Sequence, residues 1–167
     1  MKINTFEDMY LAELQELASA ERQLGDSLGP MAEAVSHAEL KNVLIDQQER
    51  TQEQQRRLLS ILRVHGIEST PHTDQAMQAL VKETRKMLNI LKGDDLRDAG
   101  LIASIQRLKH YEIAAYGTVA TLAAQLGFDD DVELLEESLD EEKEVDGLLT
   151  RIARREVNLD ALASQSG

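Results

Sequence analysis

The chain has 167 residues, 42% of them hydrophobic, so it is long enough to form one domain with a sizeable core. A formal net charge of −13 argues against a nucleic-acid or membrane partner, because nucleic acid and anionic lipid repel such a surface. There is no cysteine, no N-terminal apolar signal core and no run of about 18 apolar residues, so we expect a cytoplasmic protein without disulfides, thiolate metal sites or a membrane span.

Two long helices are predicted in the first part of the chain. Residues 4–7 have the spacing of a capping box, and apolar residues at helical spacing follow them. We expect the Gly-Pro pair at 29–30 to kink this first helix or to end its regular part. A second capping box, at residues 36–39, predicts a helix that runs to about residue 64 and closes near Gly66.

Three more helices are predicted in the rest of the chain. After the loop "GIESTPHTD", a short helix is expected from about Asp74 to residue 92, ended by a glycine. A long helix capped by Asp94 or Asp95 should continue to the next glycine stop, at residue 127. The stretch "FDDD" then starts a last long helix that runs to roughly Glu156, and a short C-terminal tail follows.

Four long helices and one short helix predict an all-α fold. We expect a ferritin-like antiparallel four-helix bundle, with the helix at 74–92 in the long crossover between the second and third long helices and outside the core. The bundle core spans about residues 4–156 of a single domain, residues 1–167. Aromatic residues make up only 3% of the chain, which favours a helical core over a β-sandwich or barrel.

Three of the four long helices carry a glutamate in the middle of the apolar stripe, where leucine would be expected. These glutamates are Glu21, Glu112 and Glu141. Glu21 and Glu112 are 91 residues apart (112 − 21). The same separation relates Glu49 and Arg50, in the middle of the second helix, to Asp140 and Glu141, in the middle of the fourth, as expected if the chain contains two similar helix pairs. Facing carboxylates from paired helices are typical of di-iron sites, so the pattern predicts iron, with manganese or zinc as substitutes.

The second long helix is polar in its middle but does not contain the Glu-x-x-His motif of such sites. Glu49-x-x-Gln52 and Glu141-x-x-Glu144 have the required spacing without the histidine. The predicted metal ligands are therefore Glu21, Glu49, Gln52, Glu112, Glu141 and Glu144. Glu142 is an alternative inward carboxylate in the fourth helix. No phosphate loop, dinucleotide fingerprint or nucleophile elbow is present, so no catalytic residue is assigned.

A glutamate inside a helical core also has a structural interpretation. It is more often bonded to tyrosine, arginine or water than to a metal, and Arg50 could pair with an inner glutamate in place of a metal charge. We interpret Tyr10, Tyr111 and Tyr116 as core or boundary residues. Three carboxylates at one depth cannot all stay ionised without a cation, so a metal, Arg50 or a retained proton must resolve the conflict.

At "AERQL", "HYEIAAYGTVATLAAQLG" and "LLEESLDEEKEVDGLL" the chain resembles the bacterial YciE/YciF family, and the similarity runs from about residue 6 to residue 152. The resemblance implies a ferritin-like fold, a homodimer and an association with stress responses. It places Glu21, Glu112, Glu141 and Glu49 at carboxylate positions of the family. The chain departs from the family in the second helix, where "DQQERTQEQQ" is poorer in histidine and glutamate.

Two functions therefore stay open from the sequence. The first is a non-haem iron protein with one or two iron ions between facing helices and oxidation chemistry toward oxygen or peroxide. The second is a metal-free helical bundle that retains a degenerate site and acts by binding a protein partner or itself. The first requires Glu49 or a neighbouring glutamine of the second helix to reach the centre, and the second requires Arg50 to do so.

Overall fold

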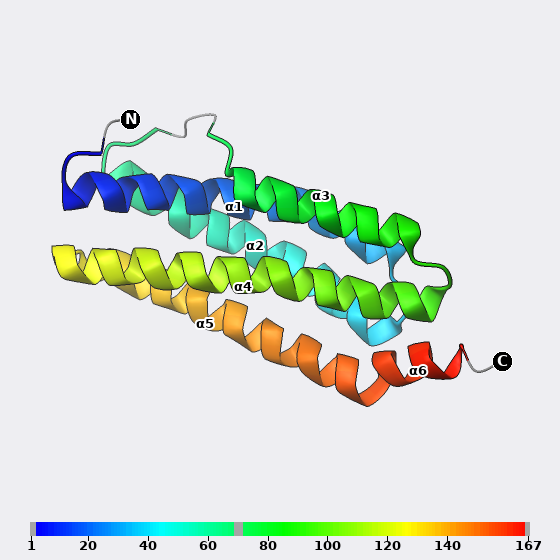
Figure 1. The fold of residues 1–167 in the computed structure, drawn as a ribbon. Helices are drawn as coiled ribbons and strands as arrows, with labels where there is room; N and C mark the ends of the chain where they lie inside the picture. Colours follow the sequence, from blue (N-terminus) through cyan, green and yellow to red (C-terminus); the bar gives the residue numbers. More distant parts are fainter. Residues whose placement is uncertain (1–2, 69–71, 166–167) are drawn as a thin grey trace.

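The computed structural model describes residues 3–68 and 72–165, and its regular elements in these residues are all helices (Figure 1). They are α1 (Phe6–Ala34), α2 (Ala38–Val64), α3 (Gln75–Ile90), α4 (Asp94–Leu126), α5 (Asp129–Ile152), the π-helical turn η1 (Ala153–Val157) and α6 (Asn158–Ala163). The prediction of an all-α fold is confirmed. Within α1 the chain stays helical through Pro30, so the Gly-Pro pair does not end the helix.

The four long helices α1, α2, α4 and α5 lie side by side, with α1 antiparallel to α2 and α4 antiparallel to α5 (Figure 1). Across the pairs, α1 packs on α4 and α2 packs on α5. The short helix α3 lies along the outside, against α1 and α4, and buries only Met77, Val81 and Thr84. Asp74 caps α3 as predicted, because its carboxylate accepts the N–H of Met77 at 2.8 Å.

The starts of the first two helices differ from the prediction. Thr5 rather than Asn4 caps α1: its hydroxyl accepts the Asp8 N–H at 3.0 Å, and the Asp8 carboxylate accepts the Thr5 N–H at 2.9 Å. His37 rather than Ser36 caps α2. The serine hydroxyl is not needed there, because a carboxylate of α4 accepts the backbone N–H groups of residues 36 and 37.

The ends of the second helix pair also differ. Gly93, with φ of 88°, is the N-cap residue of α4. Asp94 and Asp95 therefore lie in the first turn of the helix instead of capping it. The regular part of α5 ends at Ile152, and the predicted end at Glu156 falls inside η1. The chain then continues into α6, so part of the expected tail is helical.

Two apolar clusters fill the interior, one toward each end of the long helices. One cluster is centred on Leu24, Leu28, Leu44, Leu101, Ile105 and Leu149. The other is centred on Tyr10, Leu14, Leu58, Ile61, Val119 and Leu122. In each long helix the two sets of residues are separated in sequence by buried polar side chains, so a polar layer crosses the molecule between the two apolar halves.

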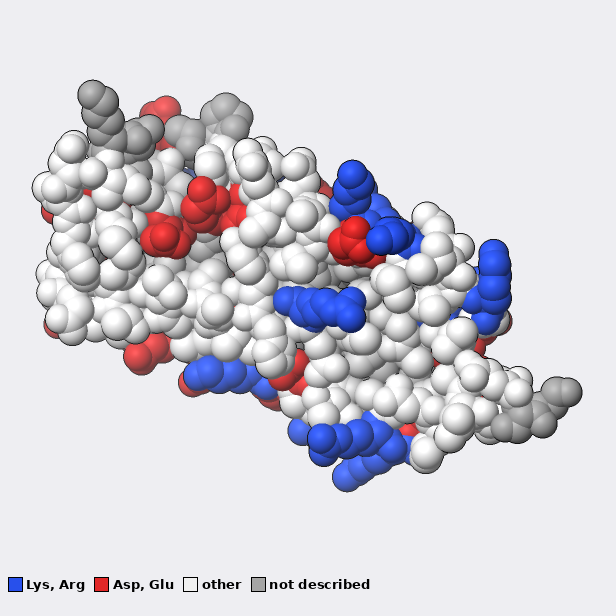
Figure 2. Space-filling view, viewed as in Figure 1, with Lys and Arg blue, Asp and Glu red and all other residues white. Residues whose placement is uncertain are grey.

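The outer surface carries its charges unevenly. On the face drawn in Figure 2, the Lys and Arg side chains gather over α3 and the C-terminal part of α5, whereas the end formed by the start of α1 and the end of α4 shows only acidic ones. Among the described residues, no helix has both the length and the apolar character that a membrane crossing requires.

Candidate functional site

The polar layer contains three glutamates with no exposed surface. Glu21 comes from α1, Glu112 from α4 and Glu142 from α5. Each lies at the point of its helix where the two apolar clusters meet, so none can reach water by moving along the helix surface. Burying a carboxylate at such a depth requires compensation by hydrogen bonds, a counter-charge or a proton.

Lys109 supplies the counter-charge. Its side chain is fully buried, and its Nζ lies 2.8 Å from Oε2 of Glu142 and 3.2 Å from Oε2 of Glu112. Burial alone would lower the pKa of Lys109, but the surrounding carboxylates of Glu112, Glu142 and Glu21 outweigh burial and raise that pKa above its usual value. The lysine therefore stays charged and holds carboxylates from two helices together.

Two further side chains complete what we call the glutamate–lysine layer, which consists of Glu21, Gln54, Lys109, Glu112, Tyr116 and Glu142. The Tyr116 hydroxyl donates to Oε1 of Glu21 at 2.6 Å. The amide of Gln54, from α2, donates to Oε1 of Glu142 at 3.0 Å. All four long helices thus contribute one side chain or more to a single network.

The layer holds protons as well as the lysine charge. Burial, and next the charge of Glu142, raise the pKa of Glu21 to about 8. Burial also raises the pKa of Glu112 well above its usual value, against the opposing effect of Lys109. Burial thus favours the protonated form of Glu21 and Glu112, and Lys109 lies within ion-pair distance of Glu112 and Glu142.

The structure brings only two of the six predicted ligands into this layer, namely Glu21 and Glu112. Glu141 lies at the edge of the layer: its side chain is 23% exposed, and its carboxylate accepts from Gln54 at 3.0 Å and binds Arg57 at 2.8 and 3.0 Å. Glu142, which the sequence offered as the alternative, is the inner residue. The buried stripe of α5 includes Ser138, Val145 and Ile152, as the apolar pattern predicts, but it contains Leu135, Glu142 and Leu149 in place of Leu134, Glu141 and Leu148.

The other three predicted ligands, Glu49, Gln52 and Glu144, are exposed, and none lies in the layer. Arg50 is not an internal counter-charge either, since it is exposed and pairs with Glu144 at 2.9 Å. Sequence reasoning missed Lys109. The available signal was its position, three residues before Glu112 on the same helical face, where the two side chains meet.

These residues do not fit the iron site that the sequence predicts. An ammonium group has no lone pair for a metal, and Lys109 Nζ occupies the space between the carboxylates of Glu112 and Glu142. No histidine belongs to the layer. Over residues 3–68 and 72–165, no group of three or more His, Asp or Glu side chains has a geometry that could hold a metal ion.

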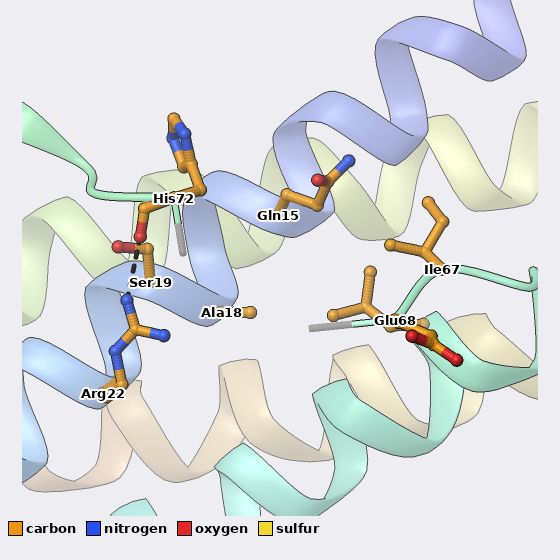
Figure 3. Close-up of a pocket in the computed structure, with 8 residues that line it drawn as sticks. Gln15, Ala18, Ser19, Arg22, Ile67, Glu68 and His72 are labelled. Atoms are coloured by element: carbon orange, nitrogen blue, oxygen red, sulfur yellow. Dashed lines mark hydrogen bonds between the residues drawn. The ribbon is translucent and has the colours of Figure 1, made fainter. Parts of the chain in front are cut away.

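A separate small cavity lies between α1 and the chain that follows α2 (Figure 3). Its volume is about 20 Å³, and Gln15, Ser19 and Ile67 are among the side chains around it. The guanidinium of Arg22 donates to the backbone carbonyl of His72 at 2.8 Å across one side. No predicted ligand lines this cavity, and it has room for about one water molecule, so the glutamate–lysine layer remains the candidate site.

Comparison with known proteins agrees with this fold. Escherichia coli protein YciF is 36% identical over 159 residues, which cover 95% of this chain and 96% of YciF. The crystal structure of YciF, described as a stress protein, matches with a TM-score of 0.89 over 93% of this chain and 99% of that one. YcfI from Rhodopseudomonas palustris, named as a candidate structural protein, is 33% identical with a TM-score of 0.86, over 89% of this chain and 95% of that one.

A protein from Xanthomonas campestris that is only 17% identical matches with a TM-score of 0.77, over 96% of this chain and 99% of that one, so the fold extends to distant sequences. The family described as "Domain of unknown function (DUF892)" matches residues 5–162. The resemblance to YciF that the sequence motifs indicate is therefore confirmed. The chain belongs to the DUF892 family and is a relative of YciF.

Proposed function

We propose that this chain is a stress-associated cytoplasmic protein with a ferritin-like four-helix bundle that works without a resident metal, as a structural or protein-interaction module. Two antiparallel helix pairs with carboxylates in a central layer support the ferritin-like architecture. The description of YciF as a stress protein and the name of YcfI as a candidate structural protein support the role. The chain acts as one domain over residues 1–167.

The single observation that carries this proposal is the position of Lys109. Its ammonium is fully buried between Glu112 and Glu142 and does within the fold what a bound cation does between facing carboxylates. The layer therefore contains a cation of its own before any metal arrives. A metal ion would have to displace the lysine and leave its charge buried without a partner, which is strongly unfavourable.

Iron binding is the second candidate, and one observation favours it. Oε2 of Glu21 and Oε1 of Glu112 have no hydrogen-bond partner among the described residues. Carboxylate oxygens of this kind are ligands that iron and manganese accept. In this alternative Glu21, Glu112 and Glu142 would hold the metal, and oxidation chemistry would follow only after Lys109 had moved away.

Iron loading separates the two candidates. Wild-type protein, Glu112→Ala and the exposed control Glu49→Ala are incubated anaerobically with Fe(II) and desalted, and the iron per chain is measured together with the urea midpoint. We expect near-zero iron in all three, and a loss of a few kcal/mol in the free energy of unfolding for Glu112→Ala alone. Stoichiometric iron in wild type and Glu49→Ala that disappears in Glu112→Ala would establish the iron function instead.

A further inference from the structure

The middle of α2 is buried and yet polar. Gln47 is 4% exposed, and Thr51 and Gln54 have no exposed surface. The three residues follow one another at i, i+4 and i+7, so they share one inward face. Each has an oxygen without a hydrogen-bond partner among the described residues, namely Oε1 of Gln47, Oγ1 of Thr51 and Oε1 of Gln54. Buried polar atoms of this kind destabilise a fold unless something else bonds to them.

The unpaired atoms continue into the glutamate–lysine layer. Oε2 of Glu21 and Oε1 of Glu112 also have no partner in the described part of the chain. The nearby donors are already engaged, since Lys109 binds two carboxylates and the Tyr116 hydroxyl donates to Glu21. All five oxygens require a hydrogen-bond partner: the two amide oxygens accept, whereas the Thr51 hydroxyl and a protonated carboxyl group also donate. A cation would be repelled by the ammonium of Lys109, whereas water is neutral and donates two hydrogen bonds.

A cavity at the seam between α2 and α5 has the first residue of this row, Gln47, in its wall. Its volume is about 70 Å³, and its walls include Gln47, Val145 and Leu148. The Arg50–Glu144 ion pair, with an N–O distance of 2.9 Å, forms part of its charged rim. A buried water needs about 10–15 Å³ by the same measure, so the cavity has room for several. Gln47 therefore belongs both to the cavity and to the buried row.

The spacing along α2 suits bridging water. A rise of about 1.5 Å per residue places Thr51 about 6 Å beyond Gln47, and Gln54 about 4.5 Å beyond Thr51. Side chains three or four residues apart on a helix can meet, but the oxygens of Gln47, Thr51 and Gln54 do not bond to one another, so one water molecule between neighbours would bridge them. At the inner end, the amide of Gln54 donates to Glu142 at 3.0 Å and so joins the row to the layer.

We infer that a file of bound water runs from the α2–α5 cavity along Gln47, Thr51 and Gln54 to the unpaired oxygens of Glu21 and Glu112. Water both donates and accepts hydrogen bonds, so it supplies the partner that each of the five oxygens requires. The seam between α2 and α5 is then the route by which water reaches the layer from outside. The inference rests on unpaired acceptors and a cavity, and it is independent of the metal-free function proposed above.

The test is a measurement of cross-relaxation between water and methyl protons by NMR on isotopically labelled protein. The γ-methyl of Thr51 should give a cross-peak to water. The matched control within the same sample is Thr84, which is 2% exposed and whose hydroxyl donates to the carbonyl of Leu80 at 3.0 Å. A Thr51 methyl without a water cross-peak, or with one no stronger than that of Thr84, overturns the inference.

The access route is tested with Gln47→Leu and the nearly isosteric Gln47→Met, both checked for wild-type helix content by circular dichroism. Each replaces the amide at the inner wall of the cavity with an apolar group. We expect the Thr51 cross-peak to weaken at least fivefold in both variants. If its intensity stays at the wild-type level in either folded variant, water does not reach Thr51 past Gln47, and the proposed route is wrong.

Discussion

Lys109 is the residue on which the whole layer depends. Its aliphatic stem packs among apolar side chains while its ammonium binds carboxylates from α4 and α5. Removal of the charge leaves Glu112, Glu142 and Glu21 facing one another without a cation. Such a cluster either takes up more protons or binds a metal ion, because close carboxylates raise one another's pKa.

We therefore predict that Lys109→Met converts the layer into a site for a divalent cation. Near pH 7 the variant should lose about 3–5 kcal/mol of unfolding free energy, because a buried ion pair has lost one partner. Added Mn²⁺ should raise its melting temperature and be retained after desalting, whereas wild type should show neither effect. The control is the double variant Lys109→Met/Glu142→Gln, in which the rescue should disappear. If Mn²⁺ neither raises the melting temperature of Lys109→Met nor stays bound after desalting, Lys109 does not replace a metal ion in this layer.

The raised pKa of Glu21 predicts a distinct pH dependence. The folded protein binds this proton up to a pKa of about 8, whereas the unfolded chain releases it near the ordinary glutamate value. Between those two values the folded state holds more protons, so the free energy of unfolding should fall as pH rises, by roughly 1 kcal/mol per unit from this group. The contribution is fully present below the unfolded pKa and is lost as pH passes about 8.

Urea unfolding at pH 5, 7 and 9 measures this slope. Glu21→Gln keeps a hydrogen-bond acceptor for Tyr116 but cannot ionise, so its stability should change less over the same range. We expect the variant to match wild type at pH 5 and to exceed it at pH 9. Parallel pH profiles for the two proteins would mean that Glu21 does not carry the proton.

At the level of single elements, the helix ends depend on contacts between helices. Asp98 of α4 is 3% exposed and accepts the backbone N–H groups of Ser36 at 3.1 Å and His37 at 2.7 Å, just before α2 begins. Asp98→Ala should cost about 1–2 kcal/mol, the usual loss for a missing N-terminal cap. Chemical denaturation of this variant is compared with that of Asp95→Ala, an exposed aspartate one turn earlier, for which we expect no measurable change.

The sequence predicts which segments are helical, but it predicts less well which face of each helix points into the core. The segments lie close to the predicted ranges because glycines, prolines and capping residues act locally. The inner glutamate of α5 was misplaced because Leu134 and Leu135 are adjacent and both apolar, so a stripe can be drawn through either. Packing against α4 and α2 selects Leu135 and hence Glu142. The contact of Asp98 with the residues just before α2 was likewise not predictable, because the partners are distant in sequence.

Lys109 was missed for a different physical reason. A lysine in a helix is normally exposed, and burial at this position is favourable only because carboxylates from α4 and α5 converge on it. The sequence predicts three inner carboxylates at one depth, which would repel one another if all were ionised. The alternatives considered for relieving this repulsion were a metal, Arg50 or a retained proton. The structure shows a cation that was not among those alternatives, Lys109, beside carboxyl groups whose pKa is raised by burial.

Over the whole molecule, the layer divides the core into two apolar halves and ties all four long helices to a common depth. A slip of α1 along α4 by one turn would move Glu21 away from Tyr116 and bring an apolar residue against the lysine. The polar network thus fixes the register of the helices, as a single buried polar residue does in coiled coils. Apolar residues of equal volume at these positions would give a fold at least as stable. We therefore infer that the layer contributes the relative register of the helices rather than net stability.

Four exposed apolar side chains lie at the end where α1 begins and α2 ends. Val64 is 79% exposed there, and Ile3, Phe6 and Met9 are 57%, 48% and 38% exposed. The start of α1 and the end of α2 are neighbours because the two helices are antiparallel (Figure 1). We predict that the protein is a homodimer in which two copies bury this end against each other, since a two-fold contact covers the same patch on both chains.

Light scattering at micromolar concentration tests the dimer directly. Wild type should give a mass of about twice the 18.7 kDa of one chain. Phe6→Ser/Val64→Ser should shift the mass toward that of one chain while the helix content stays unchanged, because both side chains are too exposed to support the monomer core. The matched control is Leu159→Ser/Leu162→Ser in α6, at the opposite end, where 57% and 67% of these side chains are exposed. A wild-type mass near 18.7 kDa excludes the dimer, and dissociation by the α6 control alone places the contact at the other end.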